Sequence, residues 1–138
     1  MKIMLDEGAY EPVRGHAYDA GMDLRTPVRV VVPKNGYAVI DTGVHVEIPR
    51  GMFGKLESKS GLNVNHSVVS LGGVIDSGYT GSIKAKLYNL SGNDYIFERG
   101  DKVVQMIIQP CVIPTNIKIV DHLSDTDRGS DGFGSTGK

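Results

Sequence analysis

The chain has 138 residues, of which 40% are hydrophobic and 22% charged, and its formal net charge is −1. This length predicts one domain that is large enough to bury a core. The nearly neutral charge argues against a broad basic surface, so we expect no nucleic-acid partner. No apolar stretch approaches membrane-spanning length, and the N-terminal apolar run is too short for a signal peptide. We therefore expect a cytoplasmic protein that does not bind membranes.

The single cysteine, Cys111, excludes an internal disulfide and a cysteine-based zinc cluster. We interpret it as a small buried apolar residue within the run at residues 110–113, with a catalytic thiol as the alternative. The histidines are scattered without metal-ligand spacing, which favours surface or structural roles for all of them. They are His16, His45, His66 and His122.

Short apolar runs bounded by Gly, Pro, Asn and Asp recur along the chain, without long helical periodicity or an internal repeat. This pattern predicts an all-β sandwich or barrel. The expected strands cover residues 2–5, 24–25, 28–32, 37–41, 44–48, 52–58, 68–71, 74–75, 82–89, 95–97, 102–109 and 117–120. In residues 102–109, alternation assigns Val103 and Val104 to opposite faces. Ser60 is a candidate N-cap for a single helical turn at residues 60–63.

The segment from Gly73 to Gly81 is predicted to form a strand and a tight turn that lead into the strand at residues 82–89. Its Gly-Val-Ile run delivers Asp76, and Tyr79 follows three residues later among glycines. Glycine permits positive φ and lets a ligand approach the backbone closely. An acid and a flat ring on a rigid hairpin suit a small-molecule pocket, although an ordinary polar turn has the same pattern.

Four further clusters combine charged or polar residues with turn signals, at residues 20–24, 58–62, 97–105 and 128–137. In residues 58–62, a cation, hydroxyls and free backbone N–H groups form an anion-binding arrangement. The last cluster lies in a Gly-rich tail that begins at residue 124. Arg128 can meet a phosphate there and Phe133 can stack on a base, which favours a lid over a plain flexible tail.

Together, the five clusters resemble the trimeric all-β dUTPase family, the deoxyuridine triphosphate nucleotidohydrolases. They match the family's motifs in order: Ala-Gly-Met-Asp-Leu, Ser-Lys-Ser-Gly-Leu, Gly-Val-Ile-Asp-Ser-Gly-Tyr-Thr-Gly, Gly-Asp-Lys-Val-Val-Gln and Arg-Gly-Ser-Asp-Gly-Phe-Gly-Ser-Thr-Gly. The resemblance implies a distorted jelly-roll or β-barrel-like fold with at most one short helix. We expect a dUTPase-like β domain at residues 1–123 and a flexible C-terminal lid at residues 124–138.

The same resemblance implies Mg²⁺-dependent hydrolysis of dUTP to dUMP and pyrophosphate by a homotrimer with shared active sites. Asp76 would activate the water that attacks the α-phosphorus, and Asp23 would help hold Mg²⁺ through a water. Tyr79 would stack under the deoxyribose and crowd out a ribose 2′-hydroxyl. Main-chain groups near Gly73 and Lys84 would read the uracil edge.

The remaining residues that the resemblance implicates would bind the phosphates and cover the base. The phosphates would be contacted by Lys59, Ser60, Gly61 and Gln105. Arg128 would reach the γ-phosphate and Phe133 would cover the uracil. Amides or hydroxyls for the phosphate chain would come from Gly134, Ser135 and Thr136.

The chain departs from the family's usual motifs at three positions. Lys59 and Lys102 stand where the family often has Arg, and Asp131 stands where it often has Gly. Lys cannot form the bidentate fork that Arg makes with a phosphate, so the phosphate geometry is expected to be looser at Lys59.

Two other functions stay open beside dUTP hydrolysis. A deaminase that acts on dCTP, alone or with diphosphatase activity, belongs to the same superfamily, but those relatives lack the Gly-Phe-Gly-Ser-Thr tail. A nucleotide-binding module that regulates a protein partner would use the same pocket. We favour dUTP hydrolysis, which removes dUTP and supplies the precursor of dTMP.

Overall fold

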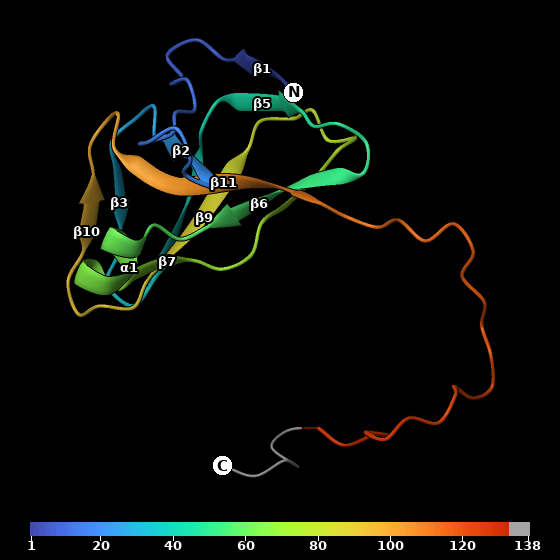
Figure 1. Cartoon of the computed structure of the whole chain (residues 1–138). Coiled ribbons are helices and arrows are strands. Elements are labelled where there is room, and N and C mark those ends of the chain that lie inside the picture. The colour runs from blue at the N-terminus through green and yellow to red at the C-terminus, as the bar shows by residue number, and fades with distance from the viewer. Residues whose placement is uncertain (133–138) are drawn as a thin grey trace.

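The computed structural model describes residues 1–132 (Figure 1). Their strands are β1 (Lys2–Leu5), β2 (Gly21–Arg25), β3 (Val30–Val32), β4 (Tyr37–Asp41), β5 (Val44–Glu47), β6 (Met52–Glu57), β7 (Val68–Ser70), β8 (Val74–Asp76), β9 (Lys84–Asn89), β10 (Tyr95–Phe97) and β11 (Lys102–Pro110). One helix, α1 (Ser60–His66), lies between β6 and β7. The predicted all-β class with at most one short helix is confirmed.

The strands form four small antiparallel sheets. Their orders are β1-β5, β10-β3, β2-β11-β6-β8 and β4-β9-β7. In Figure 1, β1 and β5 lie at one end of the body, and β3 and β10 lie at one side of it. The largest sheet places β11 between β2 and β6, so this strand joins residues from distant parts of the chain.

One apolar core joins these sheets, and all four contribute buried side chains to it. Its largest fully buried apolar members are Phe97, Leu24, Ile40, Ile83, Leu87 and Met106. Each large apolar side chain stabilises the fold by about 1.5–3 kcal/mol when fully buried. On β9, Ala85 and Leu87 point inward while Lys84 and Lys86 are exposed, as the alternation predicts.

A β-bulge changes the predicted pattern of β11. Its pairing with β2 shifts in register between Lys102 and Val104. Val103 and Val104 are both fully buried. The prediction that alternation separates them onto two faces is therefore wrong, because the extra residue of a bulge interrupts the period of the strand.

The predicted hairpin between residues 74–75 and 82–89 does not form within the described chain. Instead, β8 pairs with β6, while β9 pairs with β4 and β7. The connection between β8 and β9 therefore joins two different sheets. Local sequence predicted both strands but could not predict their partners, which are set by packing elsewhere in the fold.

The helix is longer than the predicted single turn. Lys59 occupies the N-cap position without a side-chain hydrogen bond, and Ser60 is already helical, so the prediction of Ser60 as N-cap is wrong. At the other end, Ser67 adopts a left-handed conformation with φ 55°, and its N–H closes the helix on the carbonyls of Leu62 and Asn63. With seven residues, this helix is too short to cross a membrane, and residues 1–132 contain no other helix.

After β11 the chain leaves the body as an extended segment, residues 111–132, which we call the C-terminal arm (Figure 1). At its base, the N–H of the partly exposed Cys111 donates to the Gly51 carbonyl oxygen at 2.8 Å. The predicted strand at residues 117–120 is wrong for the described chain. Ile117 is 81% and Ile119 is 99% exposed, because no neighbouring strand pairs with this segment there.

Candidate active site

A shallow cavity of about 260 Å³ lies beside the connection between β8 and β9. It is lined by Leu56, Gly73, Val74, Ile75, Asp76, Tyr79 and Lys84. Four residues that the sequence analysis singled out, Gly73, Asp76, Tyr79 and Lys84, thus meet around one hollow. We call this hollow the Tyr79 cavity.

Bare backbone at Gly73 is a structural requirement of the Tyr79 cavity. The Leu56 N–H donates to the Gly73 carbonyl oxygen at 2.8 Å, which holds this segment against β6. Gly73 has φ +121°, and an added Cβ would lie 2.8 Å from the Cβ of Leu56. A side chain at this position would therefore be strained by its backbone conformation and by contact with Leu56.

The Tyr79 ring is held by its own turn. The Tyr79 N–H donates to the Asp76 carbonyl oxygen, and the Tyr79 hydroxyl donates to the Ser82 carbonyl oxygen, both at 3.0 Å. Gly81 lies against the ring, since an added Cβ there would stand 2.5 Å from the Tyr79 hydroxyl oxygen. The side chain is nevertheless 43% exposed and thus accessible to a ligand.

A second group of residues surrounds the buried carboxylate of Asp23 on β2. Lys102 Nζ lies 2.7 Å from Asp23 Oδ2, and Lys59 Nζ pairs with Oδ1. Burial acts to raise the pKa of Asp23, but the hydrogen bonds and charges of Lys102 and Lys59 outweigh burial and hold this pKa below its ordinary value. We call Asp23, Lys59, Lys102 and Gln105 the Asp23 cluster.

Gln105 completes the Asp23 cluster from the centre of the largest sheet. It lies opposite Asp23 on β2 and opposite Glu57 on β6. Its Nε2 donates to the Ser58 carbonyl oxygen at 3.2 Å. Ser60 and Gly61 open α1 directly after Lys59. Residues of the second motif (58–62) and the fourth motif (97–105) therefore lie next to Asp23 of the first motif.

The other predicted site residues are not brought to these two groups within the described chain. The Tyr79 cavity is not lined by Asp23, Lys59 or Gln105. Arg128 lies in the C-terminal arm, where its Nε donates to the Asp131 carbonyl oxygen at 2.9 Å. The predicted contacts Phe133, Gly134, Ser135 and Thr136 lie outside the described residues.

Three side chains support these groups, although the sequence did not place them at the site. Lys102 pairs with Asp23, Asp41 accepts a hydrogen bond from the Ser82 hydroxyl, and His45 contacts the Thr80 carbonyl oxygen. His45 and Asp41 are far in sequence from the turn that they hold. Sequence spacing therefore carried no signal for them.

A preformed metal cage is absent from the described residues, where no three His, Cys, Asp or Glu side chains gather at one point. Mg²⁺ needs no such cage in nucleotide sites, since it takes one or two carboxylates together with waters and phosphates. Both oxygens of Asp23 already accept hydrogen bonds from ammonium groups. Each carboxylate oxygen has a second lone pair, so Asp23 can still accept a hydrogen bond from a water on the metal.

The family model described as dUTPase matches residues 9–137. The chain belongs to the dUTPase family. The deoxyuridine 5′-triphosphate nucleotidohydrolase of Paramecium bursaria Chlorella virus 1 is 42% identical to it over 133 residues, which are 96% of this chain and 94% of the relative. The Candida glabrata enzyme of the same name is 37% identical over 139 residues, covering 100% of this chain and 96% of the relative.

Solved dUTPases share the fold of this family member. The Staphylococcus bacteriophage 80alpha dUTPase with dUPNHPP superposes with a TM-score of 0.91 at 30% identity, covering 99% of this chain and 98% of that one. A phage phi11 dUTPase variant, solved to reveal the coordination of a structural Mg(II) ion, gives 0.81 at 29% identity, covering 90% and 98%. The predicted family is confirmed, and the chain is a hydrolase of nucleotide metabolism.

Replacing Asp23 by Asn should lower the free energy of unfolding by about 2 kcal/mol at neutral pH, because two ammonium groups lose their anion. The folded-state pKa of Asp23 is lowered, so this stabilisation is present above the unfolded-state pKa and disappears as pH falls through the folded-state value. Denaturant unfolding at about pH 7 and at an acid pH below the folded-state pKa measures both limits.

A matched control is Asp127→Asn in the exposed part of the C-terminal arm, which should change stability by less than about 0.5 kcal/mol. The wild type and the Asp23→Asn variant should become equally stable at the acid limit. An equal loss of stability at both pH values would contradict the charge-based explanation.

Proposed function

We propose that this chain hydrolyses dUTP to dUMP and pyrophosphate. The observation that carries the proposal is the meeting of Asp76, Tyr79, Gly73 and Lys84 around one cavity. Gly73, Asp76 and Tyr79 belong to the motif that the family uses for base, sugar and water, and Lys84 follows that motif at the start of β9. The names of its relatives as deoxyuridine 5′-triphosphate nucleotidohydrolases support the same reaction. Its result would be removal of dUTP and supply of the precursor of dTMP.

In the proposed reaction, Asp76 acts as a general base. Its side chain is exposed at the end of β8, and its backbone is held opposite Phe53 on β6. The carboxylate takes a proton from a water as the water oxygen bonds to the α-phosphorus. The bond between the α-phosphorus and the bridging oxygen then breaks, and pyrophosphate leaves with that oxygen. General base catalysis of this kind contributes about 10²- to 10⁴-fold.

The Tyr79 cavity would select the nucleoside. Main-chain groups near Gly73 and Lys84 would pair with the uracil edge, and a cytosine edge would leave them unpaired. Such unpaired buried groups support discrimination on the order of 10⁴-fold. The exposed Tyr79 ring would lie under the deoxyribose and crowd out a ribose 2′-hydroxyl. A tight backbone would also exclude the methyl group of thymine by steric clash.

The Asp23 cluster would bind the phosphates. A triphosphate carries about four negative charges, so several cations and N–H donors must converge on it. The predicted donors are Lys59, Ser60, Gly61 and Gln105, with Lys102 beside them. When bound, Mg²⁺ neutralises part of the phosphate charge and orients the chain of phosphates. Asp23 would hold the ion through a water.

The C-terminal tail would complete the site as a lid. Arg128 would reach the γ-phosphate, where a guanidinium can bind two oxygens at once. Phe133 would cover the uracil, and Gly134, Ser135 and Thr136 would contact the phosphates. The family resemblance supports these roles.

We also propose that the chain acts as a homotrimer with shared sites. Apolar side chains of the C-terminal arm stand in solvent when one chain is taken alone, including Val112 at 92% and Ile119 at 99% exposure. Burial of such residues favours association, at about 25 cal/mol per Å² of apolar surface. Within one chain, the Asp23 cluster does not line the Tyr79 cavity, which further supports sites built from several subunits.

Light scattering should give a mass about three times the 14.9 kDa of one chain. The double substitution Ile117→Ser and Ile119→Ser should shift the protein toward monomers, because it removes the apolar contact of the arm. Tyr18→Ser is the control, since Tyr18 is 100% exposed but lies outside the arm. A fully active monomer would contradict shared sites.

Pyrophosphate release in Mg²⁺ should be fastest with dUTP and slower by about 10³-fold or more with dCTP, dTTP and UTP. Chelation of Mg²⁺ should remove most of the activity, because the phosphate charge is then less neutralised. Deamination of dCTP would instead indicate the deaminase relatives. Binding of dUTP without hydrolysis would leave a regulatory binding module.

Asp76→Asn should lower kcat by at least about 10²-fold, because the amide cannot take the proton from water. Its Kd for a non-hydrolysable dUTP analogue should stay within about threefold of wild type, since the amide is nearly isosteric. Single-turnover kinetics and titration calorimetry measure the two quantities. The control Glu11→Gln, at an exposed carboxylate outside the site and the lid, should be unchanged. Full activity of Asp76→Asn would exclude Asp76 as the base.

A further inference from the structure

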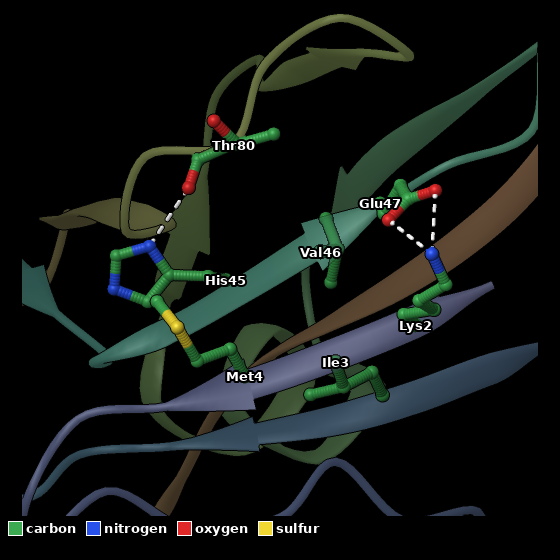
Figure 2. Close-up of a pocket in the computed structure, with 7 residues that line it drawn as sticks. All are labelled: Lys2, Ile3, Met4, His45, Val46, Glu47 and Thr80. Atoms are coloured by element: carbon green, nitrogen blue, oxygen red, sulfur yellow. Dashed lines mark hydrogen bonds and ion pairs between the residues drawn. The ribbon is translucent and has the colours of Figure 1, made fainter.

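His45 connects β5 to the turn that carries Tyr79. Figure 2 shows its ring directed from β5 toward Thr80. Nδ1 lies 2.8 Å from the Thr80 carbonyl oxygen, and Nε2 lies 3.1 Å from Asp6 Oδ1. The side chain is only 18% exposed. It thus bridges three segments: β5, the turn after β1 and the turn beside the Tyr79 cavity.

Both ring nitrogens of His45 face oxygen acceptors. The carbonyl of Thr80 and the ionised carboxylate of Asp6 have no hydrogen to donate, so each needs an N–H group. Neutral imidazole carries one N–H and can satisfy only one of them. In either neutral tautomer, a nitrogen lone pair points at an oxygen. The imidazolium satisfies both, so the arrangement of acceptors favours the charged ring.

The charged groups around the ring come from several elements: Asp6 after β1, Asp41 at the end of β4, Lys84 on β9, and Lys2 and Glu47 along the groove in Figure 2. Lys2 and Glu47 pair with each other at 3.0 Å, and Lys84 lies 3.8 Å from Asp41. The lysines are therefore paired with carboxylates. The net effect of these neighbours favours a cation at the ring.

The pKa of His45 is raised above its ordinary value, chiefly by the hydrogen bond to the Thr80 carbonyl and then by the one to Asp6. A smaller effect of burial opposes them, and the charge of Asp41 adds to them. The ring therefore stays protonated further into the neutral pH range than a free histidine.

The Thr80 carbonyl has no other hydrogen-bond partner among residues 1–132. The same turn is also attached at Ser82, whose hydroxyl donates to Asp41. Within the turn, Tyr79 donates to the Ser82 carbonyl. Ser82 is therefore held by Asp41 of β4, whereas the peptide between Thr80 and Gly81 is held through its carbonyl oxygen by His45.

We propose that His45 is a positioning residue for dUTP hydrolysis, which ties the Tyr79 turn to β5 through the Thr80 carbonyl. The inference rests on the proposed function, because Tyr79 would lie under the deoxyribose. Loss of the proton leaves one N–H, which the charged Asp6 carboxylate binds more strongly than the Thr80 carbonyl does, so the bond to Thr80 is lost. The turn is held fully at pH values below the unfolded-state pKa, and this restraint weakens as pH rises through the folded-state pKa. KM for dUTP should therefore rise with pH, while kcat at saturating dUTP changes less.

Two substitutions at His45 test its hydrogen bonds to Thr80 and to Asp6 separately. In His45→Asn, the amide nitrogen can replace Nδ1 and donate to Thr80. In His45→Gln, the longer amide can replace Nε2 and donate to Asp6. We expect KM within about twofold of wild type for His45→Asn and about fivefold higher for His45→Gln, the effect of one net hydrogen bond. Both variants should lose the rise of KM with pH that the wild type shows between about pH 6 and 9.

His16→Asn is the matched control, because His16 is exposed and contacts only the neighbouring Asp19 side chain among the described residues. It should keep the wild-type pH profile of KM. Thermal unfolding of each variant verifies folding. If His45→Gln does not fold, Asp6→Asn replaces it, since the Asn amide can donate to Nε2 and leave Nδ1–H on the Thr80 carbonyl, which should abolish the rise in KM.

A second readout does not depend on turnover. The Gly81 amide nitrogen is bonded to the Thr80 carbonyl carbon, so its NMR shift in the nucleotide-free protein should titrate together with the His45 ring. The inference would be overturned if the Gly81 amide shift did not titrate with the His45 ring. It would also be overturned if the His45→Gln variant kept the wild-type KM and its pH profile. If the wild type fails to hydrolyse dUTP, the proposed function fails, and the Gly81 titration decides the role of His45 alone.

Discussion

The β-bulge in β11 is the constraint on which the core and the Asp23 cluster both depend. In a regular strand, residues three positions apart point to opposite faces. Lys102 and Gln105 have this spacing, yet Lys102 reaches Asp23 Oδ2 and Gln105 lies directly opposite Asp23. The register shift between Lys102 and Val104 supplies the extra residue that brings both to one carboxylate. The same shift lets Val103 and Val104 enter the core together.

Charge balance explains why the Asp23 cluster suits an anionic ligand. One buried carboxylate is paired with two ammonium groups, so the cluster keeps an excess positive charge while no charge is buried alone. The Tyr79 cavity has the opposite character, with bare backbone at Gly73 and an exposed ring. Under the proposed function, the phosphate region and the nucleoside region would therefore lie on different elements of the fold.

The local sequence pattern was sufficient to predict many of the strands. The strands at Tyr37–Asp41 and Tyr95–Phe97 have the predicted ends, because their turns and their alternation are encoded in adjacent residues. Long-range pairing was not predictable in the same way. The partner of β8 is β6 rather than β9, and residues 117–120 have a strand-like sequence without a strand beside them in the described chain.

The same distinction applies to the candidate site. Gly73, Asp76 and Tyr79 lie close in sequence, so their meeting at one cavity followed from one motif. The contact of Lys59 with Asp23 and that of His45 with Thr80 depend on sheet packing, which no local spacing reveals. The roles carried over from the family, including those of the tail residues, stay predictions.

The place of the single cysteine has a practical consequence. Cys111 is partly exposed and stands where β11 ends and the C-terminal arm begins, anchored by its N–H to Gly51. A thiol-reactive spin label would attach at one position per chain, without any engineered cysteine. Distances between labels on neighbouring chains would then map how the arms leave their bodies, with and without nucleotide. The native sequence therefore already provides one labelling site at the point where the C-terminal arm leaves the body.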